Sequence, residues 1–140
     1  MAHEHIVYMM LVDSAVRARD EAAIRKFIPQ LEELVFRDDH KPYLAVVHRA
    51  WGVAHRLAGE YAAASERLQS ALEIFEMLNT RWQIARTLFE LGELSGANGA
   101  TEKATEYYAR ARDLFEQLGA RPDIDRLENK LNALGKKVDL

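Results

Sequence analysis

The chain has 140 residues, of which 49% are hydrophobic and 29% charged, so we expect one folded domain, residues 1–140, with a single core. Its net charge of −3 excludes the strong positive field that attracts nucleic acid or an anionic membrane, and we expect neither as a partner. The absence of cysteine excludes disulfides, thiolate metal sites and cysteine nucleophiles.

The first part of the chain predicts an irregular helical repeat at about 2–40. Its apolar run, Ile6 to Val12, ends at Asp13 and is far shorter than a membrane span needs. No basic leader precedes the run, so we expect a cytoplasmic protein. Pro29 falls inside the second predicted helix of this repeat, where it should kink or restart the helix.

Two regular repeats follow, at about 41–80 and 81–120. Laying residues 45–84 on residues 85–124 without a gap gives eleven identities in forty positions. Gly59 and Gly99 align as stops inside each repeat, and Asn79 aligns with Gly119 at the repeat ends, where a left-handed residue can close a helix. The pattern predicts helices at about 42–58, 60–78, 82–97 and 101–118.

The repeated positions also predict how the paired helices pack. Small residues recur at Gly52 and Gly92, where two helices should approach closely, whereas Phe75 and Phe115 recur as bulky residues that should fill the space between helices. Neither pair could bury its apolar face alone, so we expect neighbouring pairs to stack. A last helix at about 121–135 should cap the stack with a polar outer face.

The second and third repeats resemble the tetratricopeptide repeat family. The resemblance is carried by Trp51-Gly52, His55, Gly59, Tyr61, Ala64, Leu68 and Ala71, and again by Leu91-Gly92, Gly99, Ala104, Tyr108 and Ala111. The interval of 40 residues is longer than the usual 34 and looks more like the repeats of kinesin light chains and of sensor domains in bacterial regulators. The resemblance implies an all-α, right-handed helical solenoid of three antiparallel helix pairs and a capping helix.

The same resemblance implies a concave face, lined by the first helix of each repeat, that holds a peptide or protein. Arginine is suited to bidentate capture of carboxylates, so the ligand is expected to be an acidic segment or a C-terminal carboxylate. Alternatively, these arginines pair with neighbouring acidic side chains on a solvated face. The predicted binding residues are Arg17, Val46, Arg49, Val53, Arg56, Arg86, Phe89, Glu93 and Arg126.

Catalytic and metal-binding patterns are absent from the sequence. His48 and His55 lie seven residues apart without a third ligand at a characteristic spacing, and on the repeat register both should face the helix-pair interface. We therefore predict no enzyme, no cofactor and no metal site.

Three functions remain open. The first is a non-enzymatic adaptor that binds a peptide or protein partner. The second is a sensor or regulatory module of a transcription-regulator system that binds a small ligand or signalling peptide. The third is a homo-oligomer formed through the N-terminal repeat, because the ends of a solenoid expose apolar faces. The apolar cluster of that repeat consists of Ile6, Tyr8, Met9, Met10 and Leu11.

Overall fold

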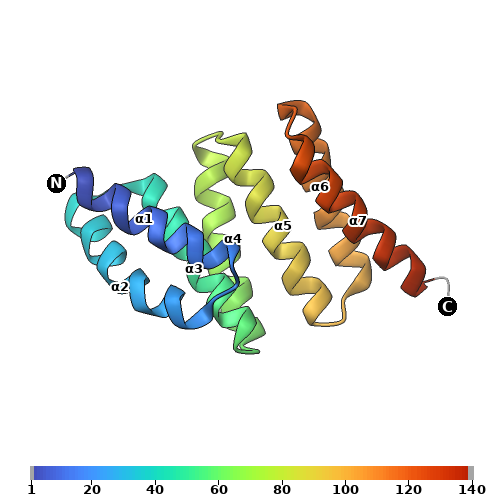
Figure 1. Cartoon of the computed structure of the whole chain (residues 1–140), viewed down its shortest axis with the longest axis horizontal. Helices are drawn as coiled ribbons and strands as arrows, with labels where there is room; N and C mark the ends of the chain where they lie inside the picture. Colours follow the sequence, from blue (N-terminus) through green and yellow to red (C-terminus); the bar gives the residue numbers. More distant parts are fainter. Residues whose placement is uncertain (1, 139–140) are drawn as a thin grey trace. The chain divides into compact units, whose positions relative to one another are not determined.

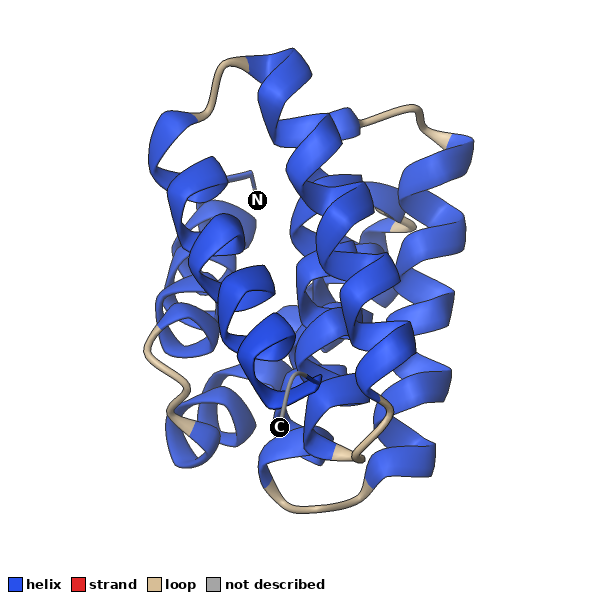
Figure 2. Ribbon diagram, turned by 90° about the vertical axis from the view of Figure 1, so that its right-hand side faces the viewer, coloured by secondary structure: helices blue, strands red, loops and turns tan. Residues whose placement is uncertain are grey.

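A computed structural model describes the backbone of residues 2–138 and the side chains of residues 6–135, and in this part of the chain all regular structure is helical (Figures 1 and 2). This confirms the all-α class, the three helix pairs and the final helix. The helices are α1 (Ala2–Arg17), α2 (Glu21–Asp38), α3 (Lys41–Leu57), α4 (Tyr61–Met77), α5 (Arg81–Ala97), α6 (Thr101–Leu118) and α7 (Arg121–Val138).

The helices form two compact units, Met1–Leu78 and Asn79–Leu140. In the first unit, α1 packs on α2 and α3, α2 packs on α3, and α3 packs on α4. In the second unit, α6 packs on both α5 and α7. The single domain and the handedness of the predicted superhelix stay predictions.

The predicted helix ends are confirmed. The four predicted helices of the regular repeats agree with α3, α4, α5 and α6 to within one residue at each end. Gly59, Gly99, Asn79 and Gly119 all have positive φ, as the repeat pattern predicts. Pro29 lies inside a continuous α2, so the helix does not restart there.

The irregular first repeat keeps the same turn geometry without the glycines. Arg19 has φ 53° and Asp39 has φ 50°, and they lie forty residues before Gly59 and Asn79 respectively. Asp39 closes α2, and its amide donates a hydrogen bond to the Val35 carbonyl. Left-handed backbone at a non-glycine residue costs roughly 1 kcal/mol, which the packing of the flanking helices must offset.

Close helix approach occurs where the sequence predicts it. A Cβ atom added at Gly52 would lie 2.6 Å from the Leu68 side chain of α4, and one added at Gly92 would lie 2.6 Å from the Tyr108 ring of α6. The hydrogen of each glycine therefore leaves room for a large side chain of the paired helix. Phe75 and Phe115 are fully buried, which confirms their predicted place in the core.

Candidate interaction site

In the first unit, most of the predicted binding residues are inaccessible. Val46, Arg49, Val53 and Arg56 on α3 are buried, with Val53 wholly shielded from solvent and Arg49 only 2% exposed. Arg17 on α1 is exposed. Sequence spacing placed these side chains on stripes of their helices, but it could not show how much of each stripe is covered.

The burial of Arg49 has a local cause. Its guanidinium lies 5.2 Å from the centroid of the Phe75 ring, which α4 carries toward α3. A cation over an aromatic face gains electrostatic attraction from the negative face of the ring, and the gain is larger away from water. Arg49 therefore contributes to the interface between α3 and α4.

In the second unit, the structure brings three predicted binding residues together. The Arg126 guanidinium of α7 lies 4.6 Å from the centroid of the Phe89 ring of α5. One turn further along each helix, the Lys130 Nζ lies 2.9 Å from the Glu93 Oε1. Phe89 is buried, whereas Arg86 of the same helix is partly exposed. Contacts from α7 thus cover part of the predicted face of α5.

Two of the predicted arginines pair with acids on their own helix. The Arg17 Nε donates to the Asp13 Oδ2 at 3.1 Å, and the Arg126 Nη2 donates to the Asp123 Oδ1 at 2.9 Å. Exposed pairs of this kind add little to stability, usually below about 1 kcal/mol. The two pairs agree with the alternative expectation that the predicted binding arginines pair with neighbouring acidic side chains.

A polar cluster around Trp51 was not predicted. The Trp51 Nε1–H donates to the Glu32 Oε2 of α2 at 2.9 Å. Guanidinium groups lie near its ring from both sides of α3, with Arg25 of α2 at 5.6 Å and Arg67 of α4 at 5.8 Å from the centroid. The indole therefore links three helices through one side chain. An isolated sequence pattern could not reveal this, because the partners come from separate helices.

His48 contacts α4 across the helix-pair interface, as predicted, whereas His55 contacts the turn between α3 and α4. The Arg67 Nη1 donates to the His48 Nδ1 at 3.0 Å, which requires that nitrogen to be unprotonated. The His55 Nδ1 lies 3.0 Å from the Glu60 Oε1, and Arg25 also donates to this carboxylate at 3.2 Å. Both histidines are partly buried, and each has a partner other than a metal.

These contacts predict a pH dependence of folding. Partial burial lowers the pKa of His48 below its ordinary value of 6.5, and Arg67 lowers it further, although Glu32 opposes the shift. Because its pKa is lowered in the folded state, the contribution of neutral His48 to the free energy of unfolding is fully present above pH 6.5. That contribution is lost as the pH falls toward the pKa of the folded state. Denaturant unfolding should therefore show the first unit losing stability on mild acidification. His48→Gln, which keeps an acceptor but does not titrate there, should flatten the dependence.

Glu60 affects folding stability at a lower pH than His48 does. The hydrogen bond from His55 is the main reason that the pKa of Glu60 lies below its ordinary value of 4.5, so its contribution is lost only in more acidic solution. Mild acidification near pH 6 thus tests His48 and leaves Glu60 ionised. If the His48→Gln variant lost stability on mild acidification as steeply as the wild type, His48 would not be the cause of the pH dependence.

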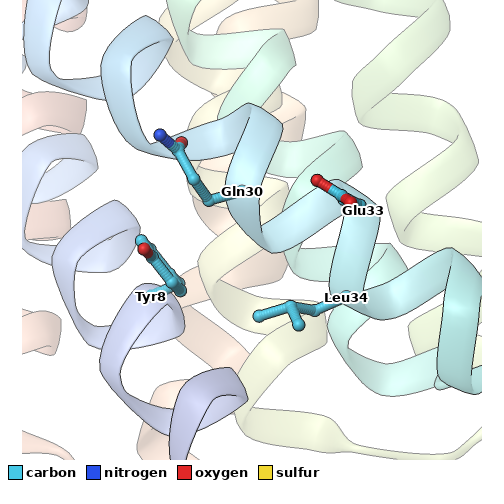
Figure 3. Close-up of a pocket in the computed structure, with 4 residues that line it drawn as sticks. All are labelled: Tyr8, Gln30, Glu33 and Leu34. Carbon is cyan, nitrogen blue, oxygen red and sulfur yellow. The ribbon is translucent and has the colours of Figure 1, made fainter.

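A small pocket lies between α1 and α2 of the first unit (Figure 3). Its volume is 260 Å³, and it is lined by Tyr8, Gln30, Glu33 and Leu34. Sites for drug-sized ligands usually begin at about 300 Å³, so this pocket has room for one small group. It includes none of the predicted binding residues.

Within the residues that the structure describes, no group of three or more His, Asp or Glu side chains is placed to hold a metal ion. Among the described helices, none combines the length and the apolar character that crossing a bilayer requires.

The chain is similar in sequence to known proteins. A sequence model described as tetratricopeptide repeat matches residues 43–117, more than half of the chain. The Photosystem I assembly protein Ycf3 of Rippkaea orientalis (strain PCC 8801 / RF-1) is 37% identical to the chain over 70 residues. That alignment covers 50% of this chain and 39% of the relative, so the chain matches well under half of the relative's length.

Proposed function

The chain belongs to the tetratricopeptide repeat family, and from this premise we propose that it is a non-enzymatic scaffold that binds a protein partner. The observation that carries the proposal is the repeat match across α3, α4, α5 and α6. The similarity to a protein named for an assembly role supports it, because assembly depends on contacts between proteins. A homo-oligomer through the N-terminal repeat stays a separate prediction.

We further propose that an accessible surface of the second unit contributes to binding. This basic surface consists of Arg86 of α5 and of Arg126 and Lys130 of α7. It holds three positive charges against two acids, Asp123 and Glu93, which pair with Arg126 and Lys130 respectively. An acidic segment or a C-terminal carboxylate is the ligand class that suits guanidinium groups. With Phe89 buried, charge contributes more here than apolar contact does.

The test is a fluorescence-polarisation titration of acidic peptides, each with a free and with an amidated C-terminus. Arg86→Glu should weaken binding of the best peptide about tenfold, because it replaces an attractive charge by a repulsive one. Arg110→Glu is the matched control, since Arg110 is an exposed arginine of the same unit on α6. If the wild-type protein binds the free-carboxylate peptide more tightly than the amidated one and Arg86→Glu binds both equally, the terminal carboxylate is the group that contacts Arg86.

Equal weakening by Arg86→Glu and Arg110→Glu would show that only overall charge matters and would contradict the basic surface. Arg49→Glu is unsuitable as a test variant. It would place a carboxylate in the buried position over Phe75 and would therefore report on folding.

A further inference from the structure

Helix α1 exposes four large apolar side chains. Ile6 is 45% exposed, Val7 53%, Met10 61% and Leu11 37%, whereas Val12 is fully buried. Helix α1 packs on α2 and α3 (Figure 1). The four exposed side chains therefore lie outside the core of the unit. Single exposed apolar residues are common, but a contiguous group of four on one helix indicates a contact surface.

We propose that these four residues, the α1 patch, join two copies of the chain through a two-fold axis, with the two α1 helices antiparallel. The patch occupies positions i, i+1, i+4 and i+5 of one helix. Reversing the helix about the point between residues 8 and 9 exchanges Ile6 with Leu11 and Val7 with Met10. The patch is therefore its own complement, which a two-fold interface requires.

Charge favours the same arrangement. The α1 patch contains no charged side chain, so two copies would bring no like charges together within it. The next charged groups along the described part of α1, Asp13 and Arg17, already pair with each other at 3.1 Å. Association at the patch itself would therefore bury no ionised group.

A head-to-tail contact between the α1 patch and α7 is disfavoured, because α7 supplies no matching apolar surface. Its exposed residues are mostly polar or charged, and they include Asp125, Glu128, Asn129 and Asn132. Contact between the α1 patch and this surface would bury polar groups against aliphatic ones. Pairing of one α1 patch with another avoids that loss.

The size of the patch sets the expected affinity. Four half-exposed aliphatic side chains offer roughly 300 Å² per copy, within the range of the largest patches on monomers. Two copies would then bury about 600 Å², well below the roughly 1,200 Å² of stable complexes. The dimer should be weak and concentration-dependent, with a dissociation constant on the order of 100 µM.

Sedimentation equilibrium of the whole chain tests the association. The wild-type mass should rise from 16.0 kDa toward twice that value as the protein concentration increases from about 10 µM to about 1 mM. Met10→Glu should weaken association at least about tenfold, because a carboxylate would be buried in the apolar interface. Met77→Glu is the matched control, since Met77 of α4 is 67% exposed but lies outside the patch.

Cysteine cross-linking tests the geometry, since the chain has no cysteine of its own. A tagged Val7→Cys protein mixed with Met10→Cys should form the mixed disulfide faster than either protein forms its own dimer, because antiparallel pairing places position 7 beside position 10. Far-ultraviolet circular dichroism of every variant confirms that helix content is kept.

Three results would overturn the proposal. The first is a wild-type chain that stays monomeric up to about 1 mM, beyond the expected dissociation constant. The second is equal weakening by Met10→Glu and Met77→Glu. The third is faster self-cross-linking of Val7→Cys than formation of the mixed disulfide, which would indicate parallel helices.

Discussion

Replacing Phe75 with alanine should lower the free energy of unfolding of the first unit by about 3–5 kcal/mol, as expected for deleting a buried aromatic side chain. Phe75 is 1% exposed and fills the space between α3 and α4. The truncation would also remove the ring that lies 5.2 Å from the buried Arg49 guanidinium. Chemical denaturation followed by circular dichroism measures the loss.

The control for this substitution is Met77→Ala, two residues further along α4. Met77 is 67% exposed, so its truncation should change stability by less than about 0.5 kcal/mol. A loss below about 1 kcal/mol for Phe75→Ala would show that the contact between α3 and α4 is looser than the burial of Phe75 indicates.

Replacing Gly92 with alanine should destabilise the second unit by about 1–3 kcal/mol, although alanine is the better helix former. The added Cβ would lie 2.6 Å from two carbons of the Tyr108 ring. That ring is only 4% exposed and packs 5.8 Å from the Phe89 ring, so it has little room to move. The difference in unfolding free energy from denaturant titration measures the effect.

Gly96, one turn later in α5, provides the matched control. A Cβ added there would meet no atom within 4 Å, so Gly96→Ala should stabilise the helix by up to about 1 kcal/mol. The same chemical change should thus have opposite signs at the two glycines. Combining Gly92→Ala with Tyr108→Leu should cost less than the two single losses added together. Destabilisation by both glycine substitutions alike would contradict the close-approach explanation.

The helices and turns of the regular repeats were predictable because their signals are local. Gly59, Gly99 and Gly119 permit the left-handed backbone that ends a helix, whatever the rest of the chain does. The family was predictable for a related reason. Small and large residues such as Gly52 and Phe75 recur at a fixed interval, and the match to the tetratricopeptide repeat confirms that interpretation.

The candidate site was much less predictable. The binding residues were placed by analogy along the first helix of each repeat, and that placement stays untested as a binding site. The sequence carried no signal that Arg49 would be buried while Arg126 stays exposed. The Trp51 cluster was also missed, since its indole, carboxylate and guanidinium groups come from three helices and share no spacing.

The sequence by itself determined the helix order, the turn positions and the family, because propensity, glycine and repeated packing residues act over a few neighbouring positions. Only the tertiary structure decided which polar side chains solvent can reach, which is set by the helices packed against them. It also decided that Arg19 and Asp39 adopt the left-handed turns that glycine and asparagine occupy in later repeats. The local preference of arginine opposes that geometry, so packing of the flanking helices must hold Arg19 in it, whereas aspartate tolerates it more readily.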